Sequence, residues 1–175
     1  MANQNERNQE AKNIIYNLSY NEVYRHVADI AKDTKRFDTT KNEDVEKCKW
    51  IAAMVDVFFD VPMHNAVNTL HLNNIQFDSK DFLCERKDEA LARRYKKRTI
   101  CEYEFVYDLF VDIAFDADAF CVSENASAEQ IEKCKWISVM CDVLSDIYMD
   151  VVDPAFVNLG FHFDWEAFAM EHNLG

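Results

Sequence analysis

One hexapeptide decides how this chain is organised: Glu-Lys-Cys-Lys-Trp-Ile occurs at residues 46–51 and again, unchanged, at residues 132–137. Six identities in a row are improbable by chance, and self-similarity at a fixed separation is the signature of a repeated structural unit. The match continues beyond the hexapeptide at the same separation of 86 residues, where the dipeptide Phe-Asp at 77–78 recurs at 163–164. The sequence therefore predicts two copies of one folding unit.

Upstream of the hexapeptide the separation between matching residues falls to 83, so that Val-Tyr at 23–24 recurs at 106–107. A three-residue insertion before the second hexapeptide explains the difference. We therefore expect a tandem duplication of a helical unit, preceded by a helical extension and divided by a basic connecting helix. The ranges are 1–20 for the extension, 21–86 for unit 1, 87–103 for the connecting helix and 104–175 for unit 2.

Apolar residues recur at steps of three and four in both units, which predicts helices that each bury one stripe of side chains. In the helix that carries the first hexapeptide, Trp50 and Met54 add a second apolar strip to the stripe formed by Cys48, Ile51 and Val55. We therefore expect this helix to lie at the centre of an all-α, pseudosymmetric helical bundle. The expected helices cover residues 5–17, 20–34, 43–60, 63–73, 79–98, 102–118, 128–150, 154–160 and 165–173.

Composition excludes several classes of function. Only two glycines and two prolines occur in 175 residues, and no glycine-rich loop that could hold the phosphates of a nucleotide is present. The six cysteines form no CxxC pair, so we expect reduced thiols packed as small apolar groups. Because the chain shows neither an apolar leader nor an 18-residue apolar stretch, we expect a cytoplasmic protein, and no cofactor motif is found.

Charge is distributed unevenly between the two units. The whole chain carries a net charge of −13, yet unit 1 sums to −3, the connector to +3 and unit 2 to −13. We interpret the basic run at 86–98 as a solvated helix face that partly neutralises neighbouring acids. The two predicted copies differ strongly in net charge. This difference indicates that the surface of unit 2 has become specialised.

The acidic residues of unit 2 stand in two ladders with a spacing of four residues, which places each ladder on one face of a helix. Like charges at this spacing destabilise a helix by about 0.2–0.5 kcal/mol per pair. Repeated like charges at this unfavourable spacing, with no compensating partner visible in the sequence, indicate a surface that binds a positively charged partner. The predicted partner-binding residues are Glu104, Asp108, Asp112 and Asp116 of the first ladder, then Asp142, Asp146, Asp150 and Asp153.

These ladders predict a function. Four helical residues rise about 6 Å, a step comparable to the spacing of phosphates along a nucleic-acid strand. We expect a non-catalytic, acidic inhibitor that binds a basic protein and does not itself bind nucleic acid. In its most specific form it is a phage or mobile-element anti-defence protein, of the anti-CRISPR or anti-restriction type, that blocks the nucleic-acid groove of a host nuclease.

Three alternatives stay open at this point. The acidic face could serve solubility alone. The Glu129-x-x-Glu132 pair followed by Asp142-x-x-x-Asp146 resembles in part the motifs of all-helical nucleotide pyrophosphohydrolases, which implies Mg²⁺-dependent release of pyrophosphate. Those enzymes combine ExxE with ExxD, and the second spacing differs here. The chain could also be a structural helical domain that associates with itself.

Overall fold

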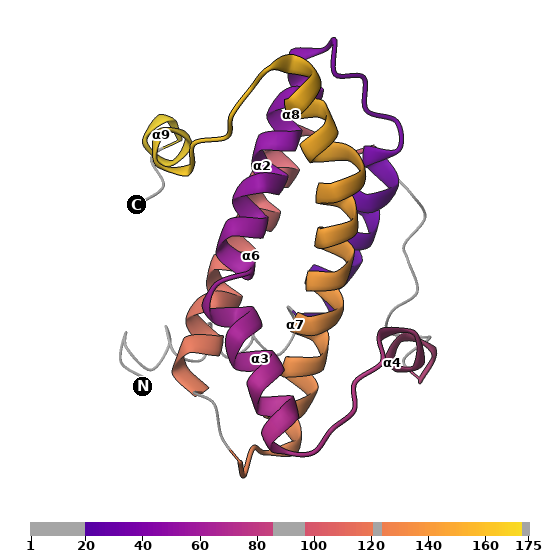
Figure 1. The fold of residues 1–175 in the computed structure, drawn as a ribbon, viewed down its shortest axis with the longest axis vertical. Coiled ribbons are helices and arrows are strands. Elements are labelled where there is room, and N and C mark those ends of the chain that lie inside the picture. Colours follow the sequence, from indigo (N-terminus) through magenta and orange to yellow (C-terminus); the bar gives the residue numbers. More distant parts are fainter. Residues whose placement is uncertain (1–19, 86–96, 121–123, 173–175) are drawn as a thin grey trace, which may run out of the picture.

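The computed structural model describes residues 20–85, 97–120 and 124–172, and all regular secondary structure in these ranges is helical (Figure 1). This confirms the all-α part of the predicted fold class. The expected helix at 5–17 and most of the connector at 87–103 lie outside the described residues. Within the described part of the chain, no helix combines the length and the apolarity needed to cross a lipid bilayer.

The observed helices follow the expected order, with most ends shifted by one to three residues. The expected helix 79–98 is described only in part, because residues 86–96 lie outside the described residues; α4 covers Ser79–Glu85, and residues 97–99 are not helical. The first described helix covers residues 20–34. The others are α2 (Asn42–Phe58), α3 (Val61–Leu72), α4 (Ser79–Glu85), α6 (Ile100–Phe120), α7 (Ala128–Ile147), the π-helical turn η1 (Tyr148–Val152), α8 (Asp153–Leu159) and α9 (Trp165–Glu171).

Local residues explain where these helices begin and end. Ser127 starts α7 with a reciprocal capping box that involves Gln130, which satisfies two backbone N–H groups that the helix cannot pair itself. Pro62 and Pro154 occupy the first turns of α3 and α8, where a missing N–H does no harm. Gly160 ends α8 in the left-handed conformation, with φ of 63°.

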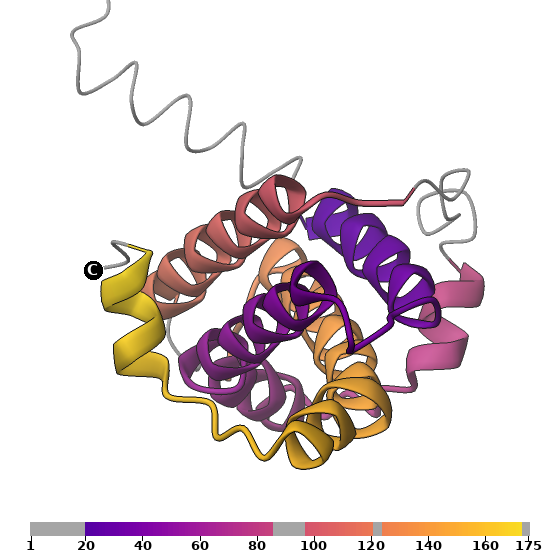
Figure 2. The same cartoon turned by 90° about the horizontal axis from the view of Figure 1, so that it is seen from above.

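The two units share one hydrophobic core. α2 packs against α3, α6, α7 and η1, and α3 packs against both α6 and α7 (Figure 2). Trp50 and Trp136, the tryptophans of the two hexapeptides, are both buried in this core. The expectation that the first hexapeptide lies on a central helix is therefore confirmed, and the burial of both tryptophans supports a packing role for the repeat.

The short helices α4 and α9 flank the bundle on opposite sides (Figure 1). Phe82 of α4 meets Trp136 of α7 at 4.8 Å between ring centroids and an interplanar angle of 80°. Phe168 of α9 meets Trp50 of α2 at 4.8 Å and 81°. Each short helix is thus anchored by one phenylalanine on the hexapeptide tryptophan of the other unit.

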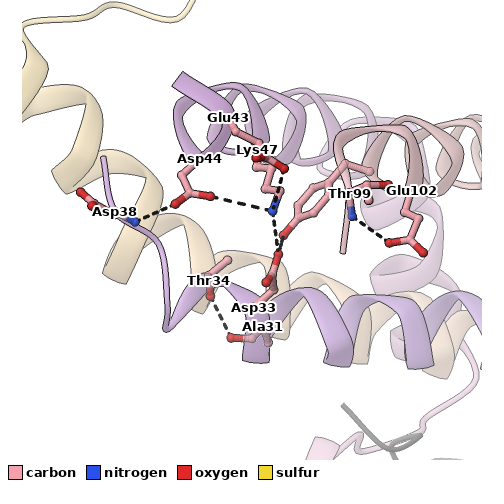
Figure 3. A network of polar contacts seen from close by, with 10 residues as sticks. Ala31, Asp33, Thr34, Asp38, Glu43, Asp44, Lys47, Thr99 and Glu102 are labelled. Carbon is pink, nitrogen blue, oxygen red and sulfur yellow. Dashed lines mark hydrogen bonds and ion pairs between the residues drawn. The ribbon is translucent and has the colours of Figure 1, made fainter. Parts of the chain in front are cut away.

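A buried polar network joins the N-terminal part of α2 to the helix at 20–34 and to α6 (Figure 3). The Lys47 side chain is 0 % exposed, and its Nζ lies 3.4 Å from Asp33 and 3.8 Å from Asp44. The Tyr103 hydroxyl donates a hydrogen bond of 2.6 Å to Asp33. Because a buried charge is tolerated only when it is paired and hydrogen-bonded, these contacts make Lys47 a structural residue.

Arg98 corrects the interpretation of the basic run as a solvated helix face. Its side chain is 9 % exposed and its guanidinium donates a 2.7 Å hydrogen bond to the buried Asp29. Residues 86–96 of the run lie outside the described residues. Arg98 therefore anchors the start of α6 to the first helix rather than facing water.

The cysteines behave largely as expected. Among the five described, all have free thiols, and Cys48, Cys134 and Cys141 are buried. Burial is the main cause that raises the pKa of Cys48 and Cys141 to about 12 and that of Cys134 to about 11. These three thiols therefore stay protonated at neutral pH and pack as small apolar groups.

Candidate functional site

The first acidic ladder lies on α6, and its N-terminal half is open to solvent. Glu104 and Asp108 are exposed, whereas Asp112 is half-buried. Burial raises the pKa of the Asp108 carboxyl, and the negative charges of Glu104 and Asp112 raise it further. No basic side chain of the described residues lies within ion-pair distance of Glu104 or Asp108. The repulsion predicted from the four-residue spacing is therefore present at Asp108, and no basic side chain of the described residues compensates it there.

Asp116, the fourth member of this ladder, has a different environment. Its carboxylate accepts a 2.6 Å hydrogen bond from the Tyr20 hydroxyl and lies 3.0 Å from Nζ of Lys133 on α7. The Asp116 side chain is 16 % exposed. Its charge is therefore neutralised inside the bundle, and Asp116 contributes to the fold instead of the open part of the ladder.

The second ladder belongs to another part of the surface. Asp142 and Asp146 are exposed on α7, and Asp150 is exposed in η1. Asp142 accepts a hydrogen bond from the hydroxyl of Ser79 at the start of α4, whereas the α6 ladder lies next to α2. The described contacts therefore place Asp142 beside α4 and Asp116 inside the bundle, so the eight predicted residues do not form one surface.

Asp153, the last predicted residue, is half-buried at the start of α8. Its charge, together with that of Asp56 on α2, adds to the burial that raises the pKa of Tyr148. Burial raises the pKa of Tyr107 to about 12, with contributions from the carboxylates of Asp108 and Asp56. The charge of Asp56 thus acts on both tyrosines, Tyr107 together with Asp108 and Tyr148 together with Asp153.

Asp56 was not among the predicted site residues. Its side chain is exposed on the wet edge of α2, and partial burial nevertheless raises the pKa of its carboxyl. A signal existed in the sequence, because Asp56 and Asp60 form a two-member ladder at the positions that match Asp142 and Asp146. Spacing along one helix could not reveal that Asp56 faces the ladder of α6.

Exposed aromatic side chains accompany these carboxylates. Phe115 is 68 % exposed and Phe105 is 54 % exposed, and both lie on α6. Phe115 stands three residues after Asp112, which places the two on the same side of the helix. Phe115 also borders a shallow groove of about 380 Å³ between α6 and the junction of α2 with α3, where Asp60 and Val61 line the other side. We name as the α6 face the set Asp56, Asp60, Glu104, Phe105, Asp108, Asp112 and Phe115.

The remaining candidate chemistry concerns metal binding. Within the described residues, no three or more His, Cys, Asp or Glu side chains are grouped so that they could hold a metal ion. Glu129, which belongs to the pattern that resembles the pyrophosphohydrolases, lies 3.5 Å from the ammonium of Lys133 one turn along α7. Comparison with family models, with curated proteins and with solved structures finds no match to this chain.

Proposed function

We propose that this protein is a non-catalytic binding module that uses the α6 face to dock on a positively charged surface of another protein. The observation that carries the proposal is the Glu104–Asp108–Asp112 ladder. Burial raises the pKa of Asp108, the charges of Glu104 and Asp112 raise it further, and no described basic side chain pairs with Glu104 or Asp108. A basic partner would relieve this repulsion, and the attraction would weaken as salt increases.

The exposed aromatic side chains of the α6 face support a second requirement for the partner, namely an apolar group that contacts them. Charges at the rim of an interface steer association, whereas buried aromatic side chains at its centre supply most of the affinity. Phe115, exposed beside the groove of about 380 Å³, is suited to that central role. The expected partner segment therefore places Arg or Lys residues around an apolar side chain.

The most specific form of the proposal is occupation of a nucleic-acid groove. Successive carboxylates of the ladder are about 6 Å apart along α6, so the face presents negative charge at a repeat comparable to that of phosphates. A host nuclease that binds its nucleic acid through such a groove would be blocked by competition. This is the mode of action that we propose for an anti-defence protein encoded by a phage or mobile element.

A matched pair of charge reversals tests the proposal. Replacing Glu104 and Asp108 by Lys removes the open ladder, whereas replacing Asp146 of α7 and Asp150 of η1 by Lys changes the net charge of the protein equally. We expect basic proteins captured from a bacterial lysate at low salt, and identified by mass spectrometry, to be lost only with the α6 pair. Circular dichroism controls for folding. Capture that survives the α6 reversal, or that is lost equally with both pairs, would contradict a role for this particular face.

We further infer that units 1 and 2 descend from one ancestral unit and pack about a pseudo-twofold axis. A tyrosine, an aspartate and a lysine at matching positions form two corresponding triads, which supports this inference. In both triads the tyrosine hydroxyl donates a 2.6 Å hydrogen bond to the aspartate, and the lysine Nζ lies 5.5 Å from the centroid of the tyrosine ring. The triads are Tyr103–Asp33–Lys47 and Tyr20–Asp116–Lys133.

Both triads are built across the units, because each tyrosine precedes the unit opposite to the one that supplies its aspartate and lysine. The hexapeptide tryptophans support the same arrangement. Trp50 lies 5.6 Å from Tyr107, and Trp136 lies 5.5 Å from Tyr24, measured between ring centroids. The matching positions thus begin at Tyr20, one residue before the predicted start of unit 1.

A further inference from the structure

The groove beside Phe115 carries a carboxylate that the fold does not use. Among the described residues that line this groove, Asp60 alone is charged. Asp60 occupies the N-cap position of α3, where an aspartate normally accepts a hydrogen bond from a backbone N–H of the first turn. Its side chain makes no such bond, and no ion pair of the described residues includes it. The carboxylate therefore stands exposed, with all of its acceptor positions open to a partner.

A buried tyrosine supplies a second unused polar group. Tyr107 lines the same groove, although its side chain is only 4 % exposed. Its ring lies 5.6 Å from that of Trp50 and 5.9 Å from that of Trp165, measured between centroids. The Tyr107 hydroxyl takes part in none of the hydrogen bonds of the described residues, yet it is not among the polar atoms that are sealed from solvent. We conclude that this hydroxyl reaches the groove that its side chain borders.

Negative charge surrounds the Tyr107 hydroxyl. Burial is the main cause that raises its pKa to about 12, and the carboxylates of Asp108 and Asp56 contribute. The phenol therefore stays protonated at neutral pH, and its oxygen can accept a hydrogen bond. The groove thus combines two oxygen acceptors with a negative potential, and this combination favours a positively charged hydrogen-bond donor.

The remaining walls of the groove distinguish between the possible cations. Val57 and Val61 line the side of α2 and α3, Val111 lines the side of α6, and Phe115 is 68 % exposed at the edge. An arginine fits these walls better than a lysine does. Its planar guanidinium carries five N–H donors, stacks on aromatic rings and is more weakly hydrated than an ammonium group. Its aliphatic stem can lie along apolar surface.

We propose that the groove beside Phe115 binds an arginine side chain of the partner protein. The guanidinium stacks on the Phe115 ring and donates hydrogen bonds to the Asp60 carboxylate and the Tyr107 hydroxyl, while the stem covers the valines. Charge complementarity indicates this occupant, because both polar groups of the groove are acceptors that the fold leaves unused. The proposal rests on the proposed function, since it identifies one of the basic residues that the α6 face contacts.

Chemical-shift mapping by NMR on the full chain tests this site with three capped tripeptides: Gly-Arg-Gly, Gly-Lys-Gly and Gly-citrulline-Gly, in which citrulline is the neutral counterpart of arginine. We expect Gly-Arg-Gly to shift the amide signals of Val61, Val111 and Phe115 in a saturable manner, and the other two to shift them several-fold less. The absence of a saturable shift with Gly-Arg-Gly would overturn the proposal. Equal shifts with citrulline would show that charge is not recognised, and equal shifts with lysine that the guanidinium is not.

Single substitutions then assign the contacts. Asp60→Asn and Phe115→Ala change exposed side chains and should each weaken binding several-fold, whereas the exposed Asp146→Asn on α7 serves as the control and should not. Tyr107→Phe should weaken binding and leave the thermal midpoint unchanged, because the hydroxyl has no partner inside the protein. Unchanged binding in both Asp60→Asn and Tyr107→Phe would place the arginine elsewhere.

The groove and the docking surface can fail separately. Gly-Arg-Gly shifts confined to Glu104 and Asp108 would refute the groove and leave the acidic docking surface intact. Conversely, arginine-specific shifts in the groove, together with lysate capture that survives the reversal of Glu104 and Asp108, would support the arginine site and contradict the proposed function.

Discussion

Units 1 and 2 make corresponding contacts inside the protein and differ where side chains reach water. In the first triad Lys47 is 0 % exposed and faces the buried Asp33 and the nearby Asp44. In the second triad Lys133 is 16 % exposed and faces Asp116, whose exposure is also 16 %. The same three residue types therefore form a fully enclosed network in one unit and a partly hydrated one in the other.

The difference in exposure between the two networks indicates which interactions tolerate substitution least. A charge held away from water has no substitute for its protein partners, so loss of one partner leaves a large desolvation penalty. In a partly hydrated pair, water can solvate the charge that remains after its partner is lost, which reduces the desolvation penalty. Surface positions are restricted least, as shown by Arg25 of unit 1, which stands where unit 2 has Asp108.

Replacing the two lysines separately tests this comparison with the largest expected effect. Lys47→Met should lower the free energy of unfolding by about 3–5 kcal/mol, because Asp33 and Asp44 would stay buried without their counter-ion. Lys133→Met should cost about 1 kcal/mol, since water already reaches that pair. Chemical denaturation followed by circular dichroism measures both. Equal losses would mean that the two networks are enclosed alike.

Removing the anchors of the short helices should have a smaller effect that is the same in both units. Phe82→Ala and Phe168→Ala should each lower the free energy of unfolding by about 3 kcal/mol, at the lower end of the range for a buried phenylalanine, because a short flanking helix can adjust. The exposed fractions of the two side chains are 3 % and 4 %, so we expect similar values. A difference above about 1 kcal/mol would argue against equivalent docking.

The smallest expected effect concerns the acidic ladder, and it is stabilising. Asp108→Asn removes two like-charge contacts and should raise the free energy of unfolding by about 0.4–1 kcal/mol at neutral pH, although it weakens partner binding. Arg25→Gln at the matching position removes the 2.6 Å pair with Glu22 and should lower stability by at most about 0.5 kcal/mol. Loss of stability in Asp108→Asn would contradict the repulsion that we infer.

The pH dependence of that gain has a definite sign. The pKa of Asp108 is raised in the folded protein, so between its ordinary and its raised value the folded state binds more protons than the unfolded state. This group therefore makes the protein less stable as pH rises through that window. The advantage of Asp108→Asn should be complete above the raised pKa and should disappear below the ordinary pKa of aspartate, which denaturation curves at several pH values would show.

Sequence reasoning worked best where the signal was periodic or repeated. The order of the helices and the central position of α2 follow from apolar spacing, which needs no knowledge of neighbours. It was wrong at residues 97 and 98, the end of the expected helix 79–98, which are not helical. Arg98 lies in this non-helical stretch and pairs with the buried Asp29.

The candidate site was predicted only in part. Glu104 and Asp108 form the open ladder that their spacing indicated, whereas Asp116 is enclosed by Tyr20 and Lys133. Nothing in the local spacing distinguishes these acids, since all stand four residues apart on one helix. Their environments differ because the C-terminal part of α6 meets other helices.

The sequence by itself determined that this protein is helical, that α2 is central and that acidic residues concentrate in unit 2. These properties depend only on the composition of the chain and on the spacing of residues within one segment. Only the tertiary structure decided that Asp56 joins the α6 face, that Asp142 belongs elsewhere and that Asp60 borders a groove. The physical reason is that spacing tells which side chains share one side of a helix, whereas burial, pairing and hydration depend on what packs against that side.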